Sequence, residues 1–169
     1  RWPRDLRLSL NVTSADLAGA SFSGQLLEAV EASGFAPTRL TVEVTEQALI
    51  GDIATARIQL EALAAAGIRI ALDDFGAGFC NFRYLKLLPL HYLKLDRTMV
   101  DGIGTEGPDL AVFRAIVAMA RALQLDVIAE GIEDEIQQTI AAREGCAAMQ
   151  GFLRARPMRA DDVLRFAGG

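Results

Sequence analysis

Short hydrophobic segments alternate with amphipathic helical segments along nearly the whole chain, and this alternation restricts the possible folds more than any other feature. The strand-like segments fall at residues 6–12, 40–45, 68–73, 92–96, 126–130 and 147–151, the last being the weakest. Most are continuous apolar runs without strict alternation, which is typical of strands covered on both faces. The pattern therefore predicts a parallel sheet with right-handed helical crossovers.

The segments between these strands carry recognisable helix boundaries. Asp52 is a suitable N-cap for a helix that Gly67 would end, and a second helix is expected from about residue 134 to 144, before Gly145. Pro108 opens another apolar pattern at three- and four-residue spacing, and Gly34 follows one more. The chain thus repeats a strand–turn–helix unit about six times.

Two architectures fit repeated units of this kind: an open doubly wound sheet and a closed barrel. A dinucleotide-binding open sheet would need a glycine-rich turn after its first strand, and residues 11–14, Asn-Val-Thr-Ser, do not supply one. A complete eight-unit barrel takes about 250 residues, whereas this chain has 169. We therefore expect one domain over residues 1–169, an α/β TIM-like (β/α) barrel that lacks about its first two strands and is incomplete at its N-terminus.

Acidic and amide residues stand at the ends of successive predicted strands. They are Asn11, Glu43 and Glu46, Asp73 and Asp74, Asp96, Glu130 and Glu133, and Gln150. In a β/α barrel, the carboxyl ends of all parallel strands meet on one rim, where active sites are found. The sequence therefore predicts a cluster of carboxylates on this rim.

A single carboxylate after a strand is more often a helix cap than a ligand, and Asp74 and Asp134 are open to that interpretation. Glu43 is different, because it lies inside the strand-like run Thr-Val-Glu-Val-Thr, where an unpaired charge is costly. Crowded carboxylates repel one another unless cations neutralise them. Oxygen donors without histidine or cysteine favour Mg²⁺ or Mn²⁺ over zinc.

Lys94 is the one basic residue predicted on the same rim, in the run Tyr-Leu-Lys-Leu-Asp. Strand alternation places Lys94 and Asp96 on the same side of the strand. Lys94 could be a buried salt-bridge partner, or it could position a metal-bound water or a phosphate oxygen. The surrounding carboxylates favour the second interpretation.

Composition excludes several classes of function. The net charge of −5 argues against binding of DNA or RNA polymers, which normally requires a basic stripe. No apolar run reaches the roughly 18 residues of a transmembrane helix, and no signal peptide is evident. We therefore expect a cytoplasmic location and no membrane contact from this segment. A membrane tether elsewhere in a longer parent protein is compatible with this expectation. His91 and the two cysteines, Cys80 and Cys146, fit structural roles.

Six motifs occur in order: Asn-Val-Thr at 11–13, Glu-Val-Thr-Glu at 43–46, Asp-Asp-Phe-Gly at 73–76, Lys-Leu-Asp at 94–96, Glu-Gly-Ile-Glu at 130–133 and Gln-Gly-Phe at 150–152. With these motifs the chain resembles the EAL family of cyclic di-GMP phosphodiesterases over essentially its whole length. The resemblance implies a barrel with one antiparallel end strand, two Mg²⁺ or Mn²⁺ ions, hydrolysis of cyclic di-GMP to linear pGpG, and a homodimer.

The resemblance also implies roles for individual residues. Asn11, Glu43 and Asp73 would bind the first metal, and Asp73 would bridge to the second beside Asp74. Glu130 would bind metal or activate water, and Lys94 would contact the attacking water. Glu46 would support the loop after Asp74, and the remaining residues would form the wall of the site: Gln150, Glu133 and Asp96.

Two departures from the family pattern leave an alternative open. The motif that names the family is expected upstream of Asn11 and is absent here, and Trp2 is expected to end a preceding helical region. The loop after Asp-Asp-Phe-Gly reads Ala-Gly-Phe-Cys-Asn at 77–81, without the usual hydroxyl residues. The alternative is a degenerate domain that binds cyclic di-GMP without cleaving it or serves as a regulatory interaction module.

Overall fold

The computed structural model describes residues 6–50, 52–78 and 82–167. Residues 1–5, 51, 79–81, 168 and 169 lie outside the described part, and with them the expectations for Trp2 and Cys80. The elements follow one another as β1 (Leu8–Val12), α1 (Ser14–Ala18), α2 (Phe22–Ser33), η1 (Pro37–Arg39), β2 (Leu40–Thr45), η2 (Gln47–Leu49), α3 (Ile53–Ala65), β3 (Arg69–Phe75), α4 (Tyr84–Leu87), β4 (Tyr92–Leu95), α5 (Arg97–Val100), α6 (Pro108–Ala122), β5 (Asp126–Ala129), α7 (Glu135–Glu144), β6 (Ala148–Met149) and α8 (Ala160–Ala167).

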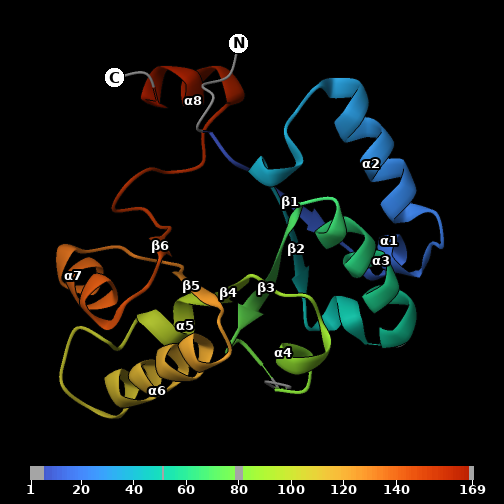
Figure 1. The fold of residues 1–169 in the computed structure, drawn as a ribbon. Helices are drawn as coiled ribbons and strands as arrows, with labels where there is room; N and C mark the ends of the chain where they lie inside the picture. Colours follow the sequence, from blue (N-terminus) through green and yellow to red (C-terminus); the bar gives the residue numbers. More distant parts are fainter. Residues whose placement is uncertain (1–5, 51, 79–81, 168–169) are drawn as a thin grey trace.

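The six strands form one sheet in the order β1-β2-β3-β4-β5-β6, and every neighbouring pair is parallel. This is the half-barrel that the strand–helix repeat predicts. The antiparallel end strand implied by the family resemblance is not among these six strands. Figure 1 shows the strands at the centre, with α2 and α3 on one side and α6 and α7 on the other.

The predicted strands are confirmed, with small shifts at their ends. The third strand continues two residues beyond the predicted end, so Asp74 lies within β3 together with Asp73. The sixth strand is reduced to two residues, which agrees with its weak sequence pattern. Leu8 and Leu10 of the edge strand β1 are 53% and 38% exposed, so this edge presents apolar surface.

Local chemistry explains where the helices begin and end. The Asp52 carboxylate accepts a hydrogen bond of 3.0 Å from the Thr55 N–H and so caps α3. Asp134 and Gln137 form a reciprocal capping box at the start of α7. Gly145 ends α7 with φ of +99°, a left-handed conformation in which glycine is favoured over residues with a Cβ.

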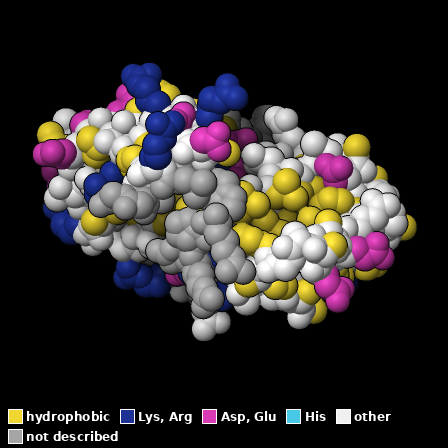
Figure 2. All heavy atoms as spheres, turned by 90° about the horizontal axis from the view of Figure 1, so that it is seen from above, with side chains coloured by type: hydrophobic (Ala, Val, Ile, Leu, Met, Phe, Trp, Pro, Cys, Tyr) yellow, Lys and Arg dark blue, Asp and Glu magenta, His cyan; other side chains and the backbone are white. Residues whose placement is uncertain are grey.

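The hydrophobic core lies between the sheet and its helices. Strand residues such as Ile70 and Leu93 are fully buried and pack in one cluster with Leu60 of α3 and Phe113 of α6. The face seen in Figure 2 shows hydrophobic side chains gathered over the half of the molecule that holds α2. No helix in the described ranges has both the length and the apolar character needed to cross a membrane.

Candidate metal centre and substrate wall

The sheet register brings the polar residues of neighbouring strands together at one end. Asn11 of β1 pairs with Glu43 of β2, and Thr45 of β2 pairs with Asp73 of β3. Glu43 and Asp73 are both 8% exposed, although each carries a charge that is costly to bury alone. The carboxylates of β2 and β3 therefore lie side by side on the rim, as the sequence predicts.

Lys94 of β4 stands at the centre of this carboxylate cluster. Its Nζ lies 2.6 Å from Glu43 Oε2, 2.9 Å from Asp73 Oδ1 and 2.9 Å from Glu130 Oε1. The side chain is 5% exposed, so the three ion pairs form in a largely desolvated place. Lys94 is thus a buried salt-bridge partner, and it also occupies the centre of the candidate site. The observed contacts are compatible with both interpretations of this residue.

Burial and neighbouring charges shift the pKa values of this cluster. Burial lowers the pKa of Lys94, but its hydrogen bonds to Glu43, Glu130 and Asp73 outweigh burial and raise the pKa above its usual value. Burial, with repulsion from Asp73 and Asp96, raises the pKa of Asp74. Burial raises the pKa of Glu130, although Lys94 opposes this shift. The cluster therefore holds more negative charge than one ammonium group can neutralise.

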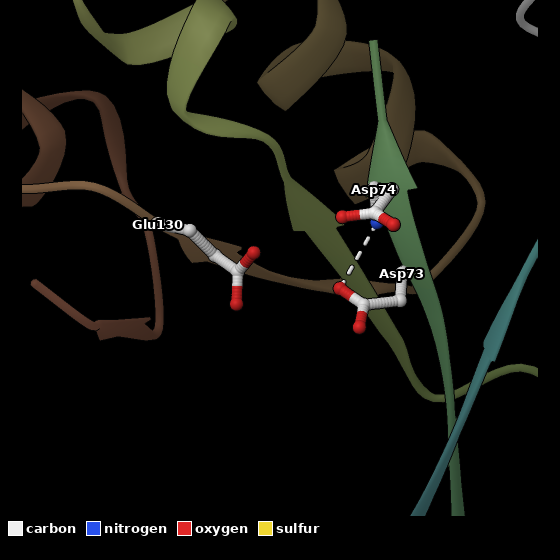
Figure 3. Close-up of side chains that lie close together, drawn as sticks. All are labelled: Asp73, Asp74 and Glu130. Carbon is white, nitrogen blue, oxygen red and sulfur yellow. Dashed lines mark hydrogen bonds between the residues drawn. The ribbon is translucent and has the colours of Figure 1, made fainter. Parts of the chain in front are cut away.

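Asp73, Asp74 and Glu130 each offer one carboxylate oxygen to a common point, and these three oxygens lie within 4.8 Å of one another. Figure 3 shows the two aspartates on β3, with Glu130 reaching toward them from the loop after β5. Asp74 has φ of +55°, an uncommon conformation for a residue with a Cβ. The Asp74 backbone N–H donates a 2.9 Å hydrogen bond to Asp73 Oδ1, which holds the Asp73 carboxylate against the backbone of β3.

The donor chemistry of this cluster fits a hard divalent cation. Carboxylate and amide oxygens are the ligands that Mg²⁺ and Mn²⁺ prefer, and the excess negative charge favours cations at this place. A second group of the same kind lines an adjoining pocket of about 630 Å³, where Asn11 and Glu43 face the same space as Asp73 and Asp74. The predicted metal-binding residues are therefore brought together along one continuous rim.

The predicted wall residues also meet. Glu133, Gln150 and Asp96 line one pocket of about 240 Å³ together with Glu130 and Arg97. Asp96 has a second, structural role that the sequence did not predict, because its carboxylate accepts hydrogen bonds from the Thr98 N–H at 2.9 Å and from Thr98 Oγ1 at 2.6 Å and so caps α5. Burial raises the pKa of Asp96, but these hydrogen bonds outweigh it and lower the pKa overall.

Glu46 is not among the residues that line this wall. It lines a third pocket, of about 430 Å³, with Asp74, Ala77 and Gly78. This places Glu46 beside the beginning of the loop that follows β3. Its predicted role as a support for that loop remains a prediction, because residues 79–81 lie outside the described part of the chain.

Arg97 and two glycines are site residues that sequence reasoning missed. Arg97 Nη1 lies 2.9 Å from Glu133 Oε1. A Cβ on Gly131 would lie 2.6 Å from Cγ of Arg97, and a Cβ on Gly151 would lie 2.1 Å from the Ile132 carbonyl oxygen. The sequence did contain a signal for these residues. Arg97 directly follows the Lys-Leu-Asp motif, and the glycines belong to the Glu-Gly-Ile-Glu and Gln-Gly-Phe motifs.

Comparison with known proteins gives a consistent result. The family model described as the EAL domain matches residues 1–157. The bifunctional diguanylate cyclase/cyclic di-GMP phosphodiesterase MucR of Pseudomonas aeruginosa is 38% identical over 160 residues, which are 95% of this chain and 23% of that protein. The chain thus spans about a quarter of the length of this curated relative.

Solved structures show the same fold. The PaMucR phosphodiesterase in complex with c-di-GMP has a TM-score of 0.85 and 37% identity, over 94% of this chain and 70% of that one. The Klebsiella pneumoniae BlrP1 manganese/cy-diGMP complex has a TM-score of 0.82 and 30% identity, over 90% of this chain and 39% of that one. With the family model matching all but the last residues, the chain belongs to the EAL domain family.

Proposed function

We propose that this domain hydrolyses cyclic di-GMP to linear pGpG. The observation that carries the proposal is the rim cluster, in which Lys94 contacts three carboxylates while Asp73, Asp74 and Glu130 converge within 4.8 Å. A structural role alone does not require so many buried charges at one strand end. MucR is named a cyclic di-GMP phosphodiesterase, and the PaMucR structure is a c-di-GMP complex.

Two Mg²⁺ or Mn²⁺ ions are the proposed cofactors. Asn11, Glu43 and Asp73 would hold one ion, and Asp73, Asp74 and Glu130 would hold the other. When bound, such ions lower the pKa of a coordinated water and offset negative charge on phosphoryl oxygens. The manganese in the BlrP1 complex supports this choice of cation.

The chain's own residues position the reactants. The Glu130 carboxylate, which lies 2.9 Å from Lys94 Nζ, would accept a proton from the attacking water. The three N–H donors of Lys94 face Glu43, Asp73 and Glu130, so its ammonium group would donate a hydrogen bond to that water or to a phosphate oxygen once one of these carboxylates turns to a metal ion. The water oxygen forms a bond to phosphorus as the bond from phosphorus to the ribose 3′ oxygen breaks. The 3′ oxygen takes up a proton, which leaves linear pGpG with a 5′ phosphate.

The other predicted residues surround this centre. Gln150, Glu133 and Asp96 would form the wall against which the dinucleotide lies, because all three line the same pocket as Glu130. Glu46 would support the loop that follows Asp74, since both line the pocket on that side. A homodimer, in which this loop takes part in the contacts, is part of the proposal.

Hydrolysis is tested with the full-length protein, cyclic di-GMP and either Mg²⁺ or Mn²⁺. The expected product is pGpG, detected by chromatography, and EDTA should abolish its formation. Absence of pGpG with both metals would overturn the catalytic proposal.

A non-catalytic receptor is the second candidate. One observation favours it. Lys94 pairs with three of the carboxylates proposed as metal ligands, so an internal cation neutralises part of the negative charge that metal ions would otherwise neutralise. Calorimetry separates the two candidates. Tight binding of cyclic di-GMP without turnover in Mg²⁺ or Mn²⁺ would establish the receptor, whereas turnover would exclude it.

A further inference from the structure

Two adjacent residues of β3, Asp73 and Asp74, direct their carboxylates to the same place, which a regular strand does not allow. Successive side chains of a strand point to opposite faces of the sheet, yet one oxygen of each aspartate converges with a Glu130 oxygen within 4.8 Å (Figure 3). We propose that Met99 is a positioning residue that holds both carboxylates at the metal centre. This inference rests on the proposed function, because it takes the rim as a metal-dependent catalytic centre.

A β-bulge between β3 and β4 explains the shared direction of the two aspartates. Leu72 of β3 pairs with Leu93 of β4. The next pair is Phe75 with Leu95, so the two aspartates together oppose one residue, Lys94. Leu72 and Phe75 are both fully buried, which agrees with an interruption of the strand alternation between them. Bulges of this kind change the direction of a side chain and are frequent beside active sites.

The backbone leaves the bulge through a tight turn. Asp74 has φ of +55° and Gly76 has φ of +105°. The Ala77 N–H donates a 3.2 Å hydrogen bond to the Asp74 carbonyl oxygen, so Gly76 is the third residue of a four-residue turn, where positive φ favours glycine. Because a residue with a Cβ seldom adopts positive φ, the structure around Asp74 has to hold this conformation in place.

Met99 packs directly on this turn. A Cβ on Gly76 would lie 2.3 Å from Met99 Cγ and 2.6 Å from Met99 Sδ, so the methionine fills the space that a side chain at residue 76 would take. The Met99 N–H donates a 2.9 Å hydrogen bond to the Asp96 carbonyl oxygen. The Asp96 N–H in turn donates a 3.1 Å hydrogen bond to the Phe75 carbonyl oxygen. Side-chain packing and backbone hydrogen bonds thus join α5 to the end of the bulge.

Loss of the Met99 side chain should release the turn. Without it, β3 can relax toward regular alternation, in which Asp74 points away from Asp73 and Glu130. The metal ion that these three carboxylates would hold then loses one ligand. Groups that orient metal ligands without touching the metal typically contribute about 10- to 100-fold to metal affinity.

The test measures calorimetric binding of Mn²⁺ alone to the full-length protein, well below its melting temperature. Met99→Ala should raise the Kd for Mn²⁺ by about 10- to 100-fold. Met99→Leu nearly conserves side-chain volume, so it should stay close to wild type. Met99→Val removes less of the side chain and should give a smaller loss in the same direction, which keeps the test valid where the alanine variant does not fold.

Met119→Ala is the matched control. Met119 of α6 is also partly buried against the core, and it does not line any of the rim pockets that contain Asp74, Glu46 or Glu130. Both alanine variants should lower the melting temperature, because each removes apolar packing. Only Met99→Ala should weaken Mn²⁺ binding, which separates positioning of the carboxylates from a general loss of stability.

Unchanged Mn²⁺ affinity in the Met99 variants, or an equal loss in Met119→Ala, would overturn the inference. Production of pGpG by the wild-type protein would in that case leave the proposed function standing. Weaker Mn²⁺ binding in Met99→Ala, together with a wild-type protein that makes no pGpG in Mg²⁺ or Mn²⁺, would support the inference and overturn the enzyme.

Discussion

Lys94 Nζ lies 2.6 Å from Glu43 Oε2, although the two residues belong to strands β4 and β2, which β3 separates in the sheet. Asp73 of the intervening strand lies 2.9 Å from the same nitrogen. Three strands therefore direct charged side chains to one point on the inner side of the curved sheet. This arrangement makes the ammonium group both a structural link between strands and a component of the candidate site.

Removal of the Lys94 charge should weaken the fold as well as the activity. Lys94→Met leaves buried carboxylates without their internal cation, which costs about 3–5 kcal/mol for a broken buried ion pair. The melting temperature in EDTA should fall, and Mg²⁺ or Mn²⁺ should restore part of the loss. We expect kcat to fall by about 10²- to 10⁴-fold. Lys86→Met, which changes the only other lysine and an exposed one, is the control and should alter neither quantity.

Asp74 should show opposite effects on stability and on metal binding. Burial and repulsion from Asp73 and Asp96 raise the pKa of the Asp74 carboxyl group. Because Asp74→Asn removes this carboxylate, repulsion in the metal-free cluster decreases. Asparagine also tolerates the φ of +55° at this position. The melting temperature in EDTA should therefore stay the same or rise, while the stabilisation gained on adding Mn²⁺ should shrink. Equal Mn²⁺-dependent stabilisation in wild type and variant would contradict this assignment.

His91 should make the fold less stable in mild acid. Burial and Arg69 lower its pKa, and its Nδ1 accepts a 3.1 Å hydrogen bond from the Ile70 N–H. The unfolded chain binds a proton at about pH 6.5, whereas the folded chain does so only at lower pH, so this contribution is present above pH 6.5 and is lost as pH falls below it. Urea denaturation at pH 5 and pH 8 should show a smaller difference in His91→Asn than in wild type.

A side chain at Gly151 should disturb the pocket that Gly151 lines with Glu133 and Gln150. The Cβ of Gly151→Ala would lie 2.1 Å from the Ile132 carbonyl oxygen and 2.4 Å from its nitrogen, so the Glu-Gly-Ile-Glu loop must move. We expect a raised KM for cyclic di-GMP and a lower melting temperature. Gly24→Ala is the control, because a Cβ there meets nothing within 4 Å. Wild-type KM in Gly151→Ala would show that the loop accommodates the methyl group without moving the wall.

The segment 1–169 produced by itself should self-associate. Edge strand β1 presents backbone groups that can pair with another strand, and its Leu8 and Leu10 side chains are exposed. Size-exclusion chromatography should show oligomers at micromolar concentration, and Leu8→Lys with Leu10→Lys should reduce them. A monomeric wild-type segment would argue against the edge as an association site.

The sequence by itself determined the repeating architecture and most of the rim. Apolar runs, capping residues such as Asp52 and Asp134, and stop glycines such as Gly145 act over a few residues, so their effects are readable locally. Because parallel strands align their carboxyl ends, residues that end different strands could be assigned to one rim before any contact was known. Lys94 and the carboxylates were identified in this way.

Only the tertiary structure decided which of those residues touch. Contact between Lys94 and Glu43 depends on sheet order and curvature, and the pairing of Arg97 with Glu133 depends on the close approach that Gly131 allows. The structure also shows that Asp96 has a second role, because its carboxylate accepts a hydrogen bond from the Thr98 N–H and so caps α5. The Lys94–Glu43 and Arg97–Glu133 contacts link residues far apart in sequence, and local spacing carries no information about the distances between them.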